Sequence, residues 1–139
     1  MFYPATFNLD PKDQCYIVSF KDIPEALTQG YSFEEAKEMA QDALITAMEF
    51  YFEENRSVPL PSIANDSEHL IALPASVWVK VLLLNTMLEQ HVSQSDLAKK
   101  LGKSRQEMQR IINLNHSTKI DTMADALACL GKSLNISLK

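Results

Sequence analysis

The sequence predicts an α+β protein with two small domains, a mixed domain at residues 1–73 and an all-helical domain at residues 74–139. Apolar and polar residues alternate near the start of the chain, as in strands with one buried face. Two helical patterns follow, first one long amphipathic helix and later a pair of short helices that flank Gly102. The chain has 139 residues, of which 46% are hydrophobic, so it can fill the core of one ordinary domain or of two small ones.

Three strands are expected before the long helix. One alternating run over residues 3–10 and another over residues 16–20 flank a polar turn at residues 10–13, which predicts an antiparallel hairpin. The apolar positions are Tyr3, Ala5, Phe7 and Leu9 in the first run and Tyr16, Val18 and Phe20 in the second. A third strand is expected at residues 26–29 and ends at Gly30.

The long helix is expected to begin at Ser32, which can form a capping box with Glu35. Small and apolar residues recur at three- and four-residue steps and predict close packing on a sheet, through Ala36, Ala40, Ala43, Ala47 and Phe50 and on through Tyr51 and Phe52. The opposite face carries four carboxylates, from Glu34, Glu38, Asp42 and Glu49.

An irregular connection is expected after the helix, because residues 55–67 hold two prolines and several polar residues. Val58, Leu60 and Ile63 indicate that this connection lies on the surface of the domain. A fourth strand is expected at residues 69–73, and Pro74, which stops it, marks the domain boundary.

The second domain is expected to open with a helix at residues 75–90 and to contain a later helix at residues 120–130. Their inward positions are Val77, Val81, Leu84 and Leu88 in the first and Met123, Leu127 and Leu130 in the second, with Trp78 in core or interdomain packing. Residues 134–138 alternate like a short C-terminal strand. Since a helical domain offers no partner strand, we expect this segment to form a dimer contact.

Residues 93–113 have the pattern of a helix-turn-helix. Gly102 is placed to take the left-handed backbone conformation that ends a helix, which a Cβ would oppose. Ser104 can cap the next helix, and Glu107 can complete a capping box. Small or apolar side chains give the two helices an inward face that allows a close crossing, from Leu97, Ala98, Leu101, Met108, Ile111 and Ile112.

The outward side chains of this segment indicate that its partner is DNA. Arginine reads guanine and glutamine reads adenine in the major groove, while other polar groups contact the backbone. We assign to DNA binding the residues Gln94, Lys103, Ser104, Arg105, Gln106, Gln109, Arg110 and Asn113. The alternative is a packed helix pair with a solvated basic face.

Charge is divided unequally along the chain. Residues 1–70 carry 13 acidic and four basic side chains, a net charge of −9, whereas residues 71–139 carry five acidic and nine basic side chains, a net charge of +4. A basic end on an acidic chain favours a DNA-binding domain. The acidic half is expected to bind a different, basic partner.

Other classes of function find little support in the sequence. Cys15 and Cys129 lie far apart with no histidine at ligand spacing, so we expect neither a metal, a cofactor nor a disulfide framework. His69, His91 and His116 are scattered, and no catalytic residue is assigned. There is no charged leader and no apolar run approaching about 18 residues, so we expect a cytoplasmic protein with no membrane partner.

The order of several short motifs resembles the HicB family of type II antitoxins over nearly the whole chain. The motifs are Phe20-Lys21-Asp22-Ile23-Pro24-Glu25-Ala26, Thr28-Gln29-Gly30, Glu34-Glu35-Ala36 and Val58-Pro59-Leu60-Pro61-Ser62. The second half by itself resembles the Cro/CI type of helix-turn-helix. Some family members carry a ribbon-helix-helix domain instead, and this sequence departs from them by having Gln94, Ala98 and Gly102 in helix-turn-helix positions.

The resemblance implies both a fold and a function. The first domain of HicB proteins is similar to part of ribonuclease H, in the order β-β-β-α-β, and it binds and occludes the HicA toxin, an mRNA-cleaving ribonuclease. The second domain represses the operon of the pair. The implied protein is a bacterial antitoxin, a homodimer or higher even oligomer, whose partners are a HicA-like toxin and operator DNA. Glu34, Glu38, Asp42 and Glu49 are the candidate toxin contacts.

Two other functions stay open on the sequence alone. The ribonuclease H fold hosts nucleases that need carboxylates converging on two metal ions, and Asp10, Asp22 and Glu49 show no such convergence. The alternative to the antitoxin is a stand-alone transcriptional repressor whose first domain senses a small ligand or another protein. A small basic open reading frame beside this one would favour the antitoxin.

Overall fold

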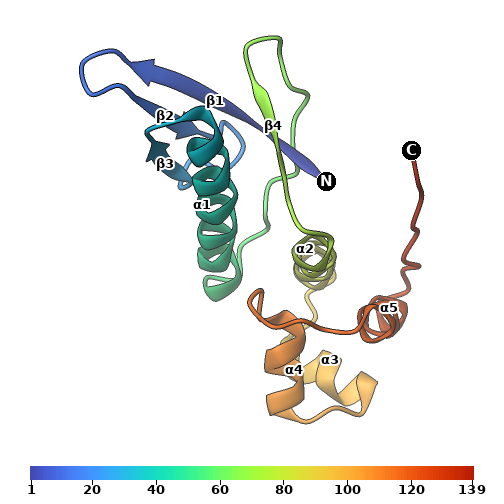
Figure 1. The fold of residues 1–139 in the computed structure, drawn as a ribbon. Coiled ribbons are helices and arrows are strands. Elements are labelled where there is room, and N and C mark those ends of the chain that lie inside the picture. Colours follow the sequence, from blue (N-terminus) through green and yellow to red (C-terminus); the bar gives the residue numbers. More distant parts are fainter. The chain divides into compact units, whose positions relative to one another are not determined.

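Four short strands pair into one antiparallel sheet in the computed structural model, which describes all 139 residues (Figure 1). The strands are β1 (Phe2–Asp10), β2 (Cys15–Ser19), β3 (Leu27–Gly30) and β4 (His69–Ala72). Their order across the sheet is β3-β2-β1-β4, so β3 and β4 form its edges. Val18 lies opposite Phe7 on one side and Thr28 on the other. The four expected strands and the α+β class are confirmed.

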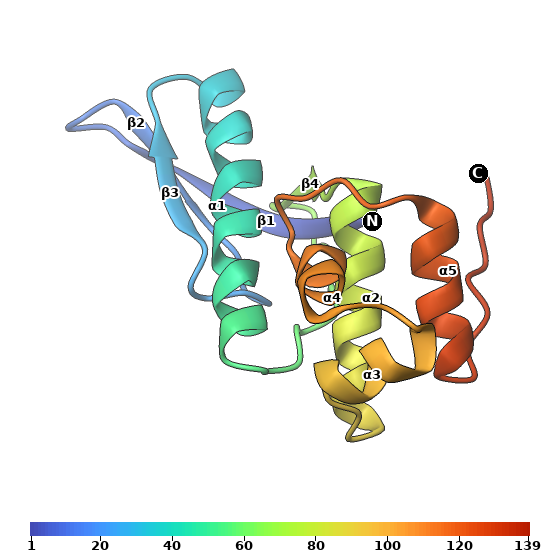
Figure 2. The same ribbon diagram turned by 90° about the horizontal axis from the view of Figure 1, so that it is seen from below.

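One helix, α1 (Phe33–Glu53), packs on the sheet (Figure 2). Tyr3, Ala5 and Val18 are fully buried beneath it. Leu9 was expected to be inward but is 55% exposed, because the β1–β2 ribbon runs on beyond the helix (Figure 2). Ser32 Oγ accepts a hydrogen bond from the Glu35 N–H at 3.1 Å, which is one half of the expected capping box.

The buried face of α1 differs in part from the expected stripe. The buried residues are Ala36, Ala40, Leu44, Ala47, Met48 and Tyr51, whereas Ala43 is half-buried and Phe50 is 50% exposed. The sequence contains two overlapping stripes, offset by one residue after Ala40. Packing buries Leu44 and Met48 instead of Ala43 and Phe50, which removes the surface of these two larger side chains from water, while Ala36, Ala40, Ala47 and Tyr51 are buried as expected.

Side-chain hydrogen bonds hold the connection between α1 and β4 against the rest of the first unit. Tyr3 Oη donates to Pro59 O at 2.7 Å, and Asp22 Oδ2 accepts from both the N–H and the hydroxyl of Ser62 at 3.0 and 2.9 Å. The expected surface path is confirmed. Of its apolar residues only Val58 is buried, while Leu60 and Ile63 are 61% and 92% exposed.

The chain divides into two compact units, the first with residues 1–53 and 58–75 and the second with residues 54–57 and 76–139. The second unit is built from α2 (Ala75–Glu89), α3 (Gln94–Leu101), α4 (Arg105–Ile112) and α5 (Ile120–Cys129). These helices enclose one apolar core, to which Leu83, Leu97, Met108 and Met123 contribute fully buried side chains.

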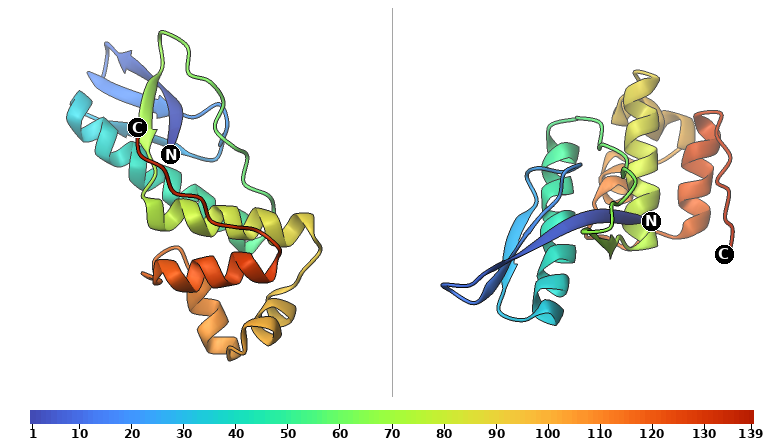
Figure 3. Two further views of the ribbon diagram at one scale, coloured as in Figure 1. Left: turned by 90° about the vertical axis from the view of Figure 1, so that its right-hand side faces the viewer. Right: turned by 90° about the horizontal axis from the view of Figure 1, so that it is seen from above.

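The expected C-terminal strand is absent, which corrects the sequence analysis. Residues 131–139 leave α5 as an extended segment without strand pairing (Figure 3). Leu134 is half-buried against the helical core, while Ile136 and Leu138 are 74% and 98% exposed. The reason is that a strand needs a partner strand for its backbone hydrogen bonds, and the four helices of the second unit supply none.

The cysteines and the lengths of the helices bear on the expectations about disulfides and membrane spans. Cys15 is buried and Cys129 is half-buried, and both are free thiols. None of the helices is both long enough and apolar enough to cross a membrane.

Candidate nucleic-acid interface

Two short helices, α3 and α4, are joined by a break of three residues whose geometry follows from Gly102. Its backbone is left-handed, with φ 67° and ψ 31°, and its N–H bonds to carbonyls at the end of α3. The N–H of Lys103 then donates to Ala98 O at 2.9 Å. Glycine favours this conformation because it has no Cβ, so α3 ends here and the chain can turn.

Both helices begin with a complete capping box. Ser104 Oγ accepts the Glu107 N–H at 3.1 Å, and Glu107 Oε2 accepts the Ser104 N–H at 2.7 Å. This confirms the capping box expected for α4. The box of α3, formed by Ser93 and Asp96, was not part of the expectation, although a serine followed three residues later by an aspartate is its usual signal.

These bonds also set the ionisation of the capping carboxylates. The bond with the Ser104 backbone lowers the pKa of Glu107, and bonds with the Ser93 side chain and backbone lower the pKa of Asp96. Both carboxylates are therefore charged at neutral pH. Each lies at the N-terminus of its helix, where a negative charge interacts favourably with the positive end of the helix dipole.

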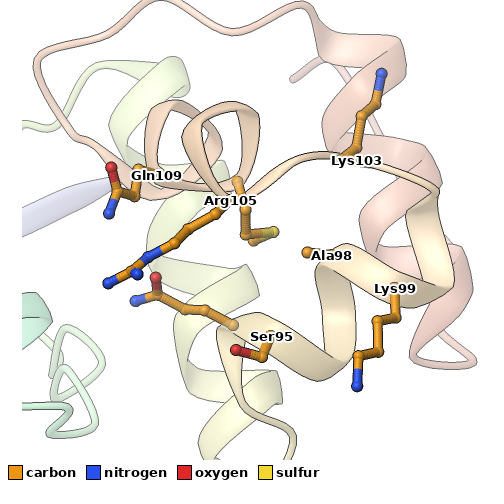
Figure 4. Close-up of a pocket in the computed structure, with 8 residues that line it drawn as sticks. Ser95, Ala98, Lys99, Lys103, Arg105 and Gln109 are labelled. Atoms are coloured by element: carbon orange, nitrogen blue, oxygen red, sulfur yellow. The ribbon is translucent and has the colours of Figure 1, made fainter.

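A groove of about 570 Å³ lies between α3 and α4 (Figure 4). Its lining is mostly polar or basic, from Gln94, Ser95, Ala98, Lys99, Lys103, Arg105, Met108 and Gln109. Arg105 and Gln109 extend from α4 on one side of the groove, while Lys99 and Lys103 point away in different directions (Figure 4). Of the residues assigned to DNA from the sequence, the groove gathers Gln94, Lys103, Arg105 and Gln109.

The other four assigned residues lie outside this groove. Gln106 and Arg110 are exposed on α4. The Ser104 hydroxyl is engaged in the helix cap, and Asn113 Oδ1 accepts the Asn115 N–H at 2.9 Å. Ser95 and Lys99 also line the groove, although neither is among the residues assigned to DNA from the sequence. Their position one turn apart on the exposed face of α3 was the available signal.

Burial behind the groove agrees with the inward face expected for α3 and α4. Leu97, Ala98, Met108 and Ile111 are buried in the core of the second unit. Leu101 and Ile112 are half-buried and pack against that core. The exposed polar face of α4 is therefore backed by apolar side chains that hold the helix against its neighbours.

A buried lysine also supports α4 from behind. Lys80, on α2, is 1% exposed, and its ammonium donates to backbone carbonyls of Arg110, Asn113 and His116. Burial lowers the pKa of Lys80 from 10.5 to about 8. Lys80 was not among the functional residues expected from the sequence. Its signal was a single charge within the apolar run at residues 77–84.

The four acidic residues expected to contact a protein partner do not form one site. Glu34, Glu38 and Asp42 are exposed and Glu49 is half-buried. A groove of about 280 Å³ places Asp42 with Leu27, Met39 and Phe50 beside the edge strand β3, and a second groove of about 300 Å³ places Glu38 with Phe2 and Leu70 beside β4. Asp42 and Glu38 thus lie next to exposed apolar side chains, one at each edge of the sheet.

No group of three or more His, Cys, Asp or Glu side chains is arranged to hold a metal ion. Asp22, one of the carboxylates weighed above for a nuclease, instead holds Ser62 of the connection. Its role in this arrangement is structural.

Residues 2–82 match the profile of a family described as a HicB-like antitoxin of bacterial toxin-antitoxin systems. Over 136 residues, the chain is 51% identical to "Antitoxin HicB" of Escherichia coli K12, covering 98% of both chains. Over the same length it is 53% identical to "Antitoxin HicB 2" of Photorhabdus laumondii, covering 98% of this chain and 95% of the relative. "Antitoxin HicB" of Pseudomonas fluorescens is 35% identical over 123 residues, or 88% and 84% of the two chains.

Proposed function

The chain belongs to the HicB-like antitoxins of bacterial toxin-antitoxin systems, and from this premise we propose that it neutralises a toxin with residues 1–73 and binds operator DNA with residues 74–139. Antitoxins are binding proteins, and the chain is accordingly not an enzyme. Division of the two tasks between the two units agrees with the opposite net charges of the two halves of the sequence.

The observation that carries the DNA-binding proposal is the exposed face of α4 together with the groove it shares with α3. Both helices are capped, the break between them is made by a left-handed glycine, and basic and amide side chains line the groove. In a helix-turn-helix, the second helix enters the major groove of DNA and the first crosses the backbone. We therefore assign α4 to base reading, and the ammonium groups of Lys99 and Lys103 to phosphates.

The toxin-binding proposal is supported by the acidic charge and the two edge grooves of the first unit. A HicA-like toxin that holds RNA phosphates needs a basic surface, and the acidic first unit would attract that surface and compete with RNA for it. Exposed apolar residues beside the acidic ones, such as Met39 and Phe50, would supply the desolvated contacts that hold a complex together.

A homodimer or a higher even oligomer is part of the proposal. One recognition helix reads only a few base pairs, so helix-turn-helix repressors bind paired half-sites as dimers. The exposed tail, with Ile136 and Leu138 among its residues, is a segment that a second copy could cover. Such a dimer would autorepress its operon at a palindromic site.

The two activities can be separated in the full-length protein. We expect Arg105→Ala together with Arg110→Ala to abolish operator binding in a gel-shift assay while leaving inhibition of the co-expressed toxin's mRNA cleavage unchanged. Glu38→Lys together with Asp42→Lys is the matched variant and is expected to do the reverse. Operator binding by a protein that never inhibits the neighbouring toxin would instead support the stand-alone repressor.

A further inference from the structure

Lys80 is an unusual residue for the position that it occupies. It lies in the middle of α2, on a segment whose neighbours Val79, Val81 and Leu83 are buried, and only 1% of its surface is exposed. Removing an ammonium ion from water is costly unless its N–H groups find partners. The side chain must therefore be compensated within the protein.

The compensation comes from backbone carbonyls at the end of α4. Lys80 Nζ donates to Arg110 O at 3.1 Å, to Asn113 O at 2.7 Å and to His116 O at 2.6 Å. An ammonium group has three N–H donors, and these three bonds use all of them. Since the last carbonyls of a helix lack intrahelical partners and carry the negative end of its dipole, a cation there is favourable.

The acceptors link Lys80 to the proposed DNA interface. Arg110 and Asn113 are both among the residues assigned to DNA, with exposed side chains, while their backbone carbonyls face Lys80. His116 O extends the contact into the loop before α5. A single buried side chain on α2 thus joins the last turn of α4 to the loop that follows it.

We infer that Lys80 is a positioning residue whose ammonium group fixes the C-terminal end of α4 and residues 113–116 against α2, and so sets how α4 meets DNA. This inference rests on the proposed DNA-binding function. It differs from a contact with DNA, because Lys80 is buried and acts through the backbone of other residues. A hydrophobic side chain of similar length would fill the space but would leave three carbonyls without this donor.

Lys80→Met in the full-length protein tests the inference, with Thr86→Val as the matched control. Thr86 is on the same helix, and its hydroxyl donates to Leu82 O within α2, so the control removes a polar group that does not bond to α4. The measurements are backbone amide hydrogen exchange of the free protein and the ratio of affinities for operator and random DNA.

Lys80→Met is expected to raise hydrogen exchange about tenfold or more at residues 110–119 relative to the rest of the second unit. It is also expected to reduce the ratio of operator to random affinity about tenfold, because α4 would lose its fixed orientation. Thr86→Val should change neither quantity. A folded Lys80→Met protein with unchanged exchange and unchanged ratio overturns the inference. So does a uniform rise in exchange across all helices of the unit, which indicates a general packing role.

If Lys80→Met does not fold, the wild-type protein decides the question. The Lys80 ammonium protons are expected to exchange slowly enough to be observed by ¹⁵N NMR, and their signal should shift on adding operator DNA but not random DNA of equal length. A signal that does not respond to operator overturns the inference. A wild-type protein that binds no DNA disproves the proposed function instead, and in that case hydrogen exchange at residues 110–119, compared between the wild type and a folded Lys80→Met protein, still tests the positioning.

Discussion

Arg105 is the first residue of α4 and lines the groove, while Lys103 lies in the break just before it. We expect Arg105→Ala to cost about 1 to 3 kcal/mol at the operator and to relax base preference, because a bidentate contact to guanine is lost. Lys103→Ala should weaken binding to all sequences alike and reduce the salt dependence. Titrations of both variants against operator and random DNA distinguish the base-reading role of Arg105 from the phosphate-binding role of Lys103. Equal losses on both DNAs for Arg105→Ala would contradict its base-reading role.

The pKa of Lys80 gives the second unit a predictable dependence on pH. It is about 8 in the folded chain, against 10.5 for an unburied lysine, so between these values the unfolded chain binds more protons. The free energy of unfolding should therefore rise with pH across this window, by at most about 3 kcal/mol from this group, and the gain is lost as pH falls through 8.

Trp78 is the only tryptophan and lies on the same helix, so its fluorescence can follow urea unfolding of this unit at pH 7.5 and pH 10. Lys80→Met is the control, since other groups titrate equally in both proteins. If the two proteins show the same difference between the two pH values, Lys80 does not cause it.

At the scale of elements, the close approach of β3 to α1 depends on Gly30. A Cβ at this position would lie 2.6 Å from Ala36 N and 2.7 Å from Ala36 Cα, which are backbone atoms that cannot rotate away. Gly30→Ala should therefore destabilise the first unit by about 1 to 3 kcal/mol, or more if the helix must shift. Thermal unfolding, followed through the NMR signals of β2, would measure this loss of stability. Gln29→Ala, at an exposed neighbouring position, should be nearly neutral, and equal stability of the two variants would show that the helix can move.

The exposed acidic face of α1 should govern how fast a basic toxin associates. Replacing Glu34, Glu38 and Asp42 with lysine is expected to slow association more than it speeds release, since exposed charges act mainly on the encounter. The difference should be greatest at low salt, because the Debye length falls from about 30 Å at 0.01 M to about 10 Å at 0.1 M. Surface plasmon resonance at both salt concentrations measures this. A change confined to the dissociation rate would place these residues inside the desolvated contact instead.

At the scale of the whole molecule, two copies should bind one operator. The recognition helices of a dimer lie about 34 Å apart when they enter successive turns of the major groove, so the operator should be palindromic. Light scattering of the full-length protein at tens of micromolar should show a dimer or a higher even oligomer. Deleting residues 132–139, which include the exposed Ile136 and Leu138, should weaken that assembly. A protein that stays monomeric under these conditions would contradict the proposal.

Local structure could be predicted from the sequence because its causes lie close together along the chain. Alternation identified the first two strands, Ser104 with Glu107 identified the start of α4, and Gly102 identified the end of α3. Motif order also identified the antitoxin family. Each of these signals needs only residues a few positions apart, or their order, and the packing of distant segments does not alter it.

Tertiary structure decided the features that depend on distant segments. The choice of the buried face of α1 required the sheet, since two stripes of the same sequence were nearly equivalent. The expected strand at residues 134–138 did not form, because the all-helical second unit contains no strand with which it could pair. Lys80 supports the proposed interface from behind only because folding brought carbonyls 30 to 36 residues away within hydrogen-bond distance. Sequence patterns describe which groups are available, whereas burial and long-range contact determine which of those groups meet.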